Sequence, residues 1–335
     1  MRFSLATLTA LAAALTSAVA CTNAPPKGSA TDEGGSRYAA LDNIPSTSAA
    51  AAQAADAKHA IKTVFVIVME NHNWSSIKGN PSAPYITGTL LALGAHAEGY
   101  TSPRDIHPSE PNYVWLEAGD NLSILDDDDP GANYRTTRVH LTGQMNTANV
   151  AWKTYQEGIA GDACPLSGGN GYAPKHNPMV FFDDVTDGRD PHSAACIAHM
   201  RPYAELERDL AADQSARYNF ITPNMCNDMH DACESGDAVA NGDRWLAREV
   251  PKILASKAYR EGGALFITWD ENEGAEGDTI GLIALSPFAK PGYANDVKYT
   301  HSSLLRSIQD VFALRPYMRD AENATGVDDL FTQFP

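Results

Sequence analysis

The sequence predicts an α/β fold with a doubly wound, mostly parallel sheet that is flanked by helices. Two observations support this prediction. Short apolar runs recur along the chain, and stretches with a helical spacing of apolar residues lie between them. Such alternation of strands and helices is typical of a parallel sheet that is covered on both faces.

The apolar runs are six or seven residues long, which is the length of a strand and too short for a buried helix. In several of them the apolar residues are almost continuous, as expected in the core of a parallel sheet. The predicted strands are residues 63–69, 149–155, 217–222, 263–269 and 280–286.

Between these strands, apolar residues recur every three or four positions, which is typical of an amphipathic helix. The predicted helices are residues 203–213, 243–256 and 301–314. The sequence contains no apparent internal repeat. Residues 60–335 are therefore expected to form one catalytic domain, since their number is acceptable for a single α/β domain.

The N-terminal residues predict export. Residues 1–20 have the layout of a secretory signal peptide, with Arg2, an apolar run and small residues before the cleavage site. The mature chain then begins at Cys21, the position that bacterial lipoproteins acylate. Residues 21–59 contain almost no large apolar residues and are expected to form a flexible tether. Two alternatives stay open: a periplasmic or outer-membrane lipoprotein attached through acylated Cys21, or a secreted protein.

The formal net charge of −17 argues against nucleic acid as a partner, because phosphates would be repelled. A phosphate substrate therefore needs local positive charge, for which a divalent metal ion is the obvious source. No feature of the sequence indicates a protein partner.

Four cysteines follow Cys21, enough for two disulfides in an oxidising compartment: Cys164, Cys196, Cys226 and Cys233. Proximity in the sequence favours the pair Cys226 and Cys233. A metal site built from thiolates is not favoured, because no CxxC spacing occurs.

Two predicted strands end in adjacent residues of metal-binding type. Glu70 and Asn71 follow the first strand, and Asp270 and Glu271 follow the fourth. In open parallel sheets, ligands bind beyond the carboxyl ends of the strands. One acidic strand end is usually a solvated loop, but two of them on neighbouring strands predict a metal site.

Ser109 lies between these two strand ends in the sequence, ahead of Pro111 and a short apolar helical pattern. It is predicted to be an N-cap residue. At that position, unpaired backbone N–H groups and the helix dipole can hold an anion and stabilise an alkoxide. A purely structural cap explains the same pattern.

Three further segments are polar. Residues 223–231 follow the third predicted strand and are dense enough in polar side chains to predict an active-site loop. The Gly- and Pro-rich residues 164–185 are expected near the mouth of the site. Lys175 and His176 in this segment are candidates for recognising the substrate. The acidic run 126–130 is interpreted as a solvated loop, with calcium binding as the alternative.

Five segments, in this order, resemble the bacterial and fungal phosphoesterase family of acid phosphatases and C-type phospholipases: VFVIVMENHNW, HPSEPNY, ITPNMCNDMHD, GDRWL and FITWDENEG. The resemblance extends from about residue 62 to residue 314. It implies the fold of the wider alkaline-phosphatase-like group.

The resemblance also implies roles for single residues. Ser109 would be the nucleophile, and a metal ion would be bound by Glu70, Asn71, Asp270 and Glu271. A metal ion can stabilise the deprotonated serine and neutralise charge on the phosphoryl group. Oxygen ligands favour Mg, Ca or Mn, and Zn is compatible with them. Some members of the wider family carry Asp-Asp where this chain has Asp-Glu, which leaves the ion preference open.

Two roles stay open for Asp228, His230 and His301. In the wider group, a corresponding region and a C-terminal histidine supply a second metal site. Alternatively, these residues bind the phosphate and protonate the leaving group, the role that we favour. Histidine suits proton donation because its unperturbed pKa of ~6.5 lies near working pH.

Three more residues are candidates for substrate binding. His107 is placed to contact the leaving group, Asn112 to orient phosphate oxygens, and Asp231 to help bind the substrate. Local packing explains His107 and Asn112 equally well.

The predicted function is a metal-dependent phosphomonoester hydrolase of the acid-phosphatase type, acting on a phosphate ester through a phosphoserine at Ser109. Cleavage of phosphodiesters, as in C-type phospholipases, is the first alternative. The second is a lipid-anchored protein that binds phosphate or metal without turnover. The short segment after the last predicted helix favours a compact phosphatase, because phospholipases of this type tend to carry further C-terminal modules.

Overall fold

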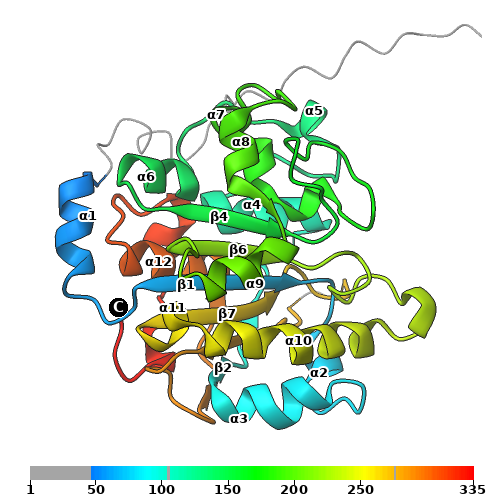
Figure 1. Cartoon of the computed structure of the whole chain (residues 1–335). Coiled ribbons are helices and arrows are strands. Elements are labelled where there is room, and N and C mark those ends of the chain that lie inside the picture. The colour runs from blue at the N-terminus through cyan, green and yellow to red at the C-terminus, as the bar shows by residue number, and fades with distance from the viewer. Residues whose placement is uncertain (1–46, 104–105, 275–276) are drawn as a thin grey trace, which may run out of the picture.

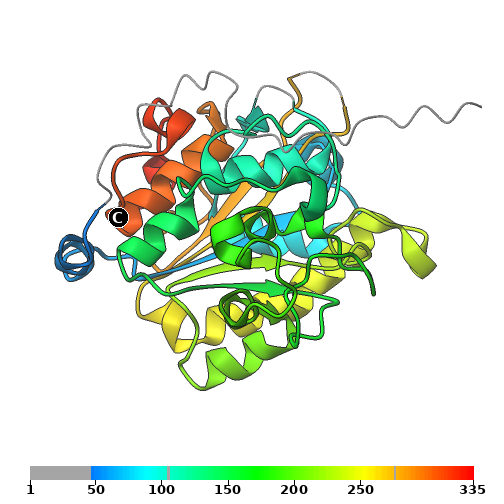
Figure 2. The same ribbon diagram turned by 90° about the horizontal axis from the view of Figure 1, so that it is seen from above.

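The computed structural model describes residues 47–335, apart from 104–105 and 275–276. An eight-stranded sheet crosses the molecule, with helices on both faces (Figures 1 and 2). Its strands, in spatial order, are β5 (Met200–Pro202), β4 (Trp152–Gln156), β6 (Tyr218–Thr222), β1 (Thr63–Met69), β7 (Gly263–Trp269), β8 (Leu282–Leu285), β2 (Ala95–Ala97) and β9 (Ala294–Asn295). A separate parallel pair consists of β3 (Tyr100–Thr101) and β10 (Tyr299–Thr300).

The sheet is mostly parallel, which confirms the predicted fold class. Strands β5, β4, β6, β1 and β7 pair in parallel, whereas β8 is antiparallel to both β7 and β2. Every residue of β1 and of β7 is buried. These two central strands are therefore covered on both faces, which explains why their sequences lack the alternation of a half-exposed strand.

Helices α4 and α12 pack on one face of the sheet, and α9 and α10 on the other (Figure 2). The α-helices are α1 (Ala49–Asp56), α2 (Trp74–Ile77), α3 (Leu91–Leu93), α4 (Ser109–Ala118), α5 (Pro130–Asn133), α6 (Leu141–Thr147), α7 (Asp183–Thr186), α8 (Ala194–His199), α9 (Ala204–Ala211), α10 (Ala238–Ala255), α11 (Lys257–Arg260) and α12 (His301–Val311). A π-helical turn, η2 (Ile86–Leu90), precedes α3. Short 3₁₀ segments are η4 (Pro174–His176), η5 (Pro178–Phe181), η6 (Cys233–Ser235), η7 (Arg319–Glu322) and η8 (Asp328–Leu330).

All the predicted strands and helices are present. Strands β1 and β7 have the predicted bounds, and the others have at least one shifted end. The helix predicted from residue 243 begins earlier, at Ala238, because Asp237 caps it by accepting a hydrogen bond from the backbone N–H of Ala240. Helix α12 begins with a capping box formed by Thr300 and Ser303. These polar caps determine where the helices start, which the apolar spacing alone does not.

The predicted signal peptide and Cys21 lie outside the described residues. The tether prediction does not hold for its last part, because Ala49–Asp56 form helix α1. Ala52 is buried in the core, and the Thr47 hydroxyl donates a hydrogen bond to the carbonyl of Ala313. Contact with the C-terminal part of the domain thus orders a segment whose composition predicts flexibility. In the part of the chain that the structure describes, no helix is long and apolar enough to cross a membrane.

Two disulfides are present, Cys226–Cys233 and Cys164–Cys196. The first is the pair that sequence proximity favours. It closes a loop across a sequence separation of 7 residues, and this loop carries Asp228. The bond therefore limits the motion of a loop that follows the central strand β6.

Candidate active site

The carboxyl ends of β1 and β7 lie side by side, as expected from the sequence. The two strands pair in parallel over their full lengths, so Glu70 and Asp270 follow them at equivalent positions. The backbone N–H of Asn71 donates a hydrogen bond of 3.0 Å to Oδ1 of Asp270, and its side-chain amide donates one of 3.1 Å to Oε1 of Glu271. The four residues predicted to bind a metal ion are thus in one cluster.

Ser109 faces this cluster from the first turn of α4. The helix begins at Ser109 itself, and Pro108 occupies the N-cap position with an extended backbone. The prediction of an N-cap serine is therefore wrong by one residue. The Ser109 hydroxyl does not cap the helix. It donates a hydrogen bond of 3.1 Å to Oε2 of Glu70, and its proximity lowers the pKa of Asp270 and of Glu271.

Tyr113 is a site residue that the sequence reasoning missed. Its hydroxyl donates a hydrogen bond of 2.5 Å to Oε1 of Glu70, and its ring stacks on that of His176. Tyr113 is four residues after Ser109, so both side chains lie on the same face of α4. This spacing is the one signal in the sequence that points to Tyr113.

Four acidic side chains form what we call the carboxylate cluster: Glu70, Asp228, Asp270 and Glu271. Burial raises the pKa of Glu70 and of Asp228 well above the usual range, and the charge of Asp270 raises both further. Burial also raises the pKa of Asp270 to about 7 and that of Glu271 to about 9. Such groups can ionise together only beside a compensating positive charge.

The donor atoms of the cluster fit a divalent cation. Among the described residues, four buried side-chain oxygens of the site have no hydrogen-bond partner: Oδ1 of Asn71, Oδ1 of Asn112, Oδ2 of Asp228 and Oδ2 of Asp270. Buried polar atoms are normally paired, so several buried oxygens without a partner in one site indicate a ligand. Carboxylate and amide oxygens are ligands that Mg²⁺, Ca²⁺ and Mn²⁺ prefer.

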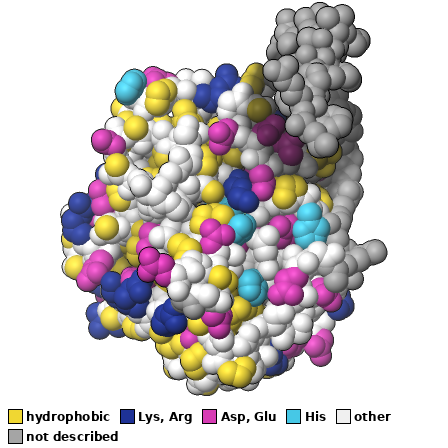
Figure 3. Space-filling model, turned by 90° about the vertical axis from the view of Figure 1, so that its right-hand side faces the viewer, with side chains coloured by type: hydrophobic (Ala, Val, Ile, Leu, Met, Phe, Trp, Pro, Cys, Tyr) yellow, Lys and Arg dark blue, Asp and Glu magenta, His cyan; other side chains and the backbone are white. Residues whose placement is uncertain are grey.

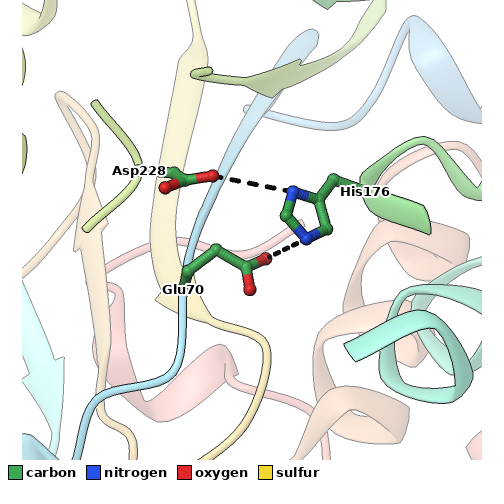
Figure 4. A group of neighbouring side chains, drawn as sticks. All are labelled: Glu70, His176 and Asp228. Atoms are coloured by element: carbon green, nitrogen blue, oxygen red, sulfur yellow. Dashed lines mark ion pairs between the residues drawn. The ribbon is translucent and has the colours of Figure 1, made fainter. Parts of the chain in front are cut away.

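The ring of His176 lies between the carboxylates of Glu70 and Asp228 (Figure 4). Candidate ligand atoms of Glu70, His176 and Asp228 lie within 4.8 Å of one another. Nε2 of His176 is 3.2 Å from Oε1 of Glu70, and Nδ1 is 3.6 Å from Oδ2 of Asp228. Burial lowers the pKa of His176 well below its usual value, and the charge of Lys175 lowers it further. The neutral ring can therefore bind a cation or donate a hydrogen bond to phosphate.

The disulfide-closed loop brings only part of its polar residues into the site. Oδ1 of the buried Asp228 accepts a hydrogen bond of 2.8 Å from the backbone N–H of His230. The His230 side chain lies at the exposed edge, with its ring 6.3 Å from the ring of His176. Nδ1 of His230 is 2.8 Å from Oδ1 of the exposed Asp231. Asp228 is thus inside the site, His230 at its edge, and Asp231 behind His230.

His301 lies behind the carboxylate cluster. It is the first residue of α12 and is fully buried. Nε2 is 2.6 Å from the backbone carbonyl oxygen of Asp270, and Nδ1 is 2.9 Å from the hydroxyl of Tyr100. A carbonyl oxygen only accepts, so Nε2 carries the proton and Nδ1 accepts from Tyr100. Burial lowers the pKa of His301 to about 4.

His107 and Asn112 both contact Glu271. Nδ1 of the partly exposed His107 lies 2.6 Å from Oε2 of Glu271. The side-chain amide of Asn112 donates a hydrogen bond of 3.2 Å to the same oxygen and one of 2.6 Å to the carbonyl of Ile106. Oδ1 of Asn112 is buried without a partner. His107, just before α4, and Asn112, within it, thus both lie at the acidic end of β7.

The face at the carboxyl ends of the central strands carries histidine side chains among acidic ones (Figure 3). Lysine or arginine side chains are interspersed with them in this view. The polar residues of the site therefore reach a surface that solvent and a ligand can approach.

The fold is that of the alkaline phosphatase superfamily. A protein of this superfamily from Vibrio parahaemolyticus has a TM-score of 0.52 at 10% sequence identity, over 81% of this chain and 72% of that chain. Murine ectonucleotide pyrophosphatase/phosphodiesterase 5 also has a TM-score of 0.52, at 12% identity, over 80% of this chain and 100% of that chain. At such identities the likeness shows a common fold.

The chain belongs to the Phosphoesterase family, whose family model matches residues 94–315. Phosphatidylinositol-3-phosphatase of Mycobacterium tuberculosis is 28% identical over 282 residues, which are 83% of this chain and 85% of that protein. The acid phosphatase of Aspergillus niger is 31% identical over 220 residues, which are 62% of this chain and 49% of the fungal protein.

The chain thus spans about half the length of fungal acid phosphatases that it matches and most of the mycobacterial relative. The resemblance noted in the sequence is confirmed. The chain is a hydrolase that acts on phosphoric ester bonds.

Proposed function

We propose that this chain hydrolyses phosphomonoesters through a phosphoserine on Ser109, with a divalent cation held by Glu70, Asn71, Asp270 and Glu271. One observation carries the proposal. The hydroxyl of Ser109, at the positive end of α4, donates a hydrogen bond to Glu70 at the end of β1, and the next residue, Asn71, donates one to Asp270 at the end of β7. A nucleophile is thus held next to a set of orphaned, cation-binding oxygens.

The residues of the chain divide the reaction into two displacements. The hydrogen bond to Oε2 of Glu70 orients the Ser109 oxygen and offers its proton an acceptor. The Ser109 oxygen then forms a bond to phosphorus while the bond from phosphorus to the leaving alcohol oxygen breaks. Water cleaves the phosphoserine in the second step and restores the hydroxyl. The bound cation would supply positive charge next to the phosphoryl oxygens.

His230 is proposed to give a proton to the leaving alcohol. Its Nδ1 is engaged by Asp231, which leaves Nε2 free to act toward the site. Exposure at the edge of the site allows the proton to be replaced from solvent. His107 lies beside Glu271, where it would contact the alcohol part of the substrate.

The group of Glu70, His176 and Asp228 has two proposed uses. It can hold a second cation, or His176 and Asp228 can bind the phosphate directly. The neutral His176 ring supports either use. Asn112 would orient phosphate oxygens through its amide. His301 is proposed as a positioning residue, since both of its ring nitrogens are engaged behind Asp270.

Hydrolysis of monoesters is favoured over cleavage of phospholipid diesters because the relatives named here are phosphatases by name. The extensive match to a phosphatidylinositol-3-phosphatase makes the phosphate of a lipid head group a second candidate substrate. A binding protein without turnover would need no serine held against the carboxylate cluster. The two disulfides support export, and attachment through an acylated Cys21 remains part of this proposal.

The experiment compares p-nitrophenyl phosphate, bis-p-nitrophenyl phosphate and phosphatidylcholine as substrates of the purified protein. We expect the monoester to be hydrolysed fastest. Chelation should remove the activity, and Ser109→Ala should lower it at least ~1,000-fold. Acid quenching should trap phosphate covalently on the wild-type protein and not on Ser109→Ala. Full activity of Ser109→Ala would refute the proposed nucleophile.

A further inference from the structure

Lys175 places a positive charge beside the carboxylate cluster. It belongs to the 3₁₀ turn η4 and directly precedes His176, whose ring reaches Glu70. Nε2 of His176 lies 3.2 Å from Oε1 of Glu70, so Lys175 is part of the turn that reaches the carboxylate cluster. Its side chain is 20% exposed and therefore partly accessible to a ligand.

Asp127 fixes the position of Lys175. Its Oδ2 accepts a hydrogen bond of 2.9 Å from Nζ of Lys175. Its Oδ1 accepts one of 2.9 Å from the backbone N–H of Glu110, the residue after Ser109. One carboxylate therefore connects the ammonium group to the first turn of the helix that carries the nucleophile. The acidic run 126–130, interpreted from the sequence as a solvated loop, thus contributes one residue to the framework of the site.

The substrates of the two candidate reactions differ in charge. A phosphomonoester loses its second proton at a pKa of ~6 and is then a dianion, whereas a diester carries a single negative charge. A second negative charge beside buried carboxylates is unfavourable unless a cation lies nearby. The ammonium group has three N–H donors, and Asp127 uses one of them, which leaves donors for phosphate oxygens.

We propose that Lys175, positioned by Asp127, binds the second negative charge of phosphomonoester dianions and so sets the preference of this site for monoesters over diesters. This inference rests on the proposed function, because it presupposes phosphoryl transfer to Ser109. It adds no covalent step. Lys175 is a specificity-determining residue, and Asp127 acts through it.

The test uses Lys175→Met in the full chain, with kcat/KM measured for p-nitrophenyl phosphate and for bis-p-nitrophenyl phosphate above the second pKa of the monoester. We expect the monoester value to fall ~30-fold and the diester value to change less than ~3-fold, as for loss of a charged hydrogen bond. Inorganic phosphate should also inhibit Lys175→Met more weakly than it inhibits the wild type, in parallel with the fall in kcat/KM for the monoester. Lys175→Arg should keep most of the preference for the monoester.

Lys153→Met is the matched control, because Lys153 forms a similar ion pair with Asp209 and is 26% exposed. It should leave the ratio of the two kcat/KM values unchanged. Equal losses on both substrates in Lys175→Met would overturn the inference. If Lys175→Met does not fold, Asp127→Asn carries the test through the same ratio, which should fall.

Ser109→Ala, measured in parallel, separates this inference from the proposed function. If Ser109→Ala keeps its activity, the proposed function fails and the inference falls with it. If Ser109→Ala is inactive while Lys175→Met loses both activities equally, only the inference about Lys175 fails.

Discussion

The hydroxyl of Tyr113 lies 2.5 Å from Oε1 of Glu70, while the hydroxyl of Ser109 lies 3.1 Å from Oε2 of the same carboxylate. The two donors are one helical turn apart on α4. Helix α4 therefore holds both carboxylate oxygens of Glu70, the residue that follows β1. This contact fixes the direction of Glu70 relative to Ser109.

Tyr113→Phe should lower kcat/KM about 10-fold and shift the acidic limb of the pH profile to higher pH. The Tyr113 hydroxyl favours the ionised form of Glu70 and so lowers its pKa. Removing the hydroxyl raises that pKa, so Glu70 becomes protonated at a higher pH than in the wild type. A charged hydrogen bond of this kind contributes about 1.5 kcal/mol. An unchanged pH profile would show that Glu70 does not depend on Tyr113.

Asp270→Asn should weaken binding of the divalent cation at least ~10-fold, as loss of a charged ligand does. Metal content can be measured directly by mass spectrometry after dialysis. Added cation should raise the unfolding temperature of the wild type and not that of the variant, because a ligand stabilises the folded state in proportion to its binding. Asp213→Asn is the control, since Asp213 is exposed and pairs with Lys257. Equal metal content in wild type and Asp270→Asn would contradict the assigned site.

His301→Gln should reduce kcat without moving either limb of the pH profile. The pKa of His301 is lowered to about 4 by burial, so the ring stays neutral through the working range. Its role is to hold the Asp270 carbonyl, and an amide can replace that hydrogen bond in part. A shifted limb would instead identify His301 as a group that exchanges protons during the reaction.

The lowered pKa of His301 also makes the stability of the protein depend on pH. The folded-state pKa of His301 lies below the unfolded value of ~6.5. Its contribution to the free energy of unfolding is therefore fully present above pH ~6.5 and is lost as the pH falls toward 4. Urea unfolding of wild type and His301→Gln across this range should show a stability difference that shrinks with acidification.

The contribution of His140 to the free energy of unfolding should depend on pH in the opposite direction. The buried ring lies between Glu117 and Asp184, at 2.9 and 3.0 Å. Burial alone would lower its pKa, but hydrogen bonds to the two carboxylates outweigh burial and raise the pKa to about 9. This contribution is fully present below pH ~6.5 and is lost as the pH rises through 9.

Asp184→Asn should therefore destabilise the protein by about 2 kcal/mol near pH 6, because breaking a largely buried ion pair leaves the charge of His140 uncompensated. Above pH ~9, where His140 is neutral, the loss should be smaller. Urea unfolding at both pH values checks this. Asp187→Asn is the control, since Asp187 accepts from Ser193 and does not contact His140. A loss of equal size at both pH values would show that His140 is not charged.

Several parts of the site were predictable because their signals are local in the sequence. Apolar runs of strand length identified β1 and β7, and the polar residues that follow them could be read directly from the chain. The pattern after Ser109 predicted a helix, although the start was misplaced by one residue because Pro108 takes the cap position. Two disulfides were expected from four cysteines, and the pair close in sequence was the correct one.

The sequence by itself determined the fold class, the family and the metal-type residues at the two strand ends, because each of these depends on order and spacing along the chain. Only the tertiary structure decided that Tyr113 binds Glu70, that His176 enters the site, and that Asp127 holds Lys175 beside the nucleophile helix. These contacts join residues from separate loops and helices. No periodic pattern in the sequence predicts these contacts, because they depend on how the sheet brings distant segments together and on the burial that results.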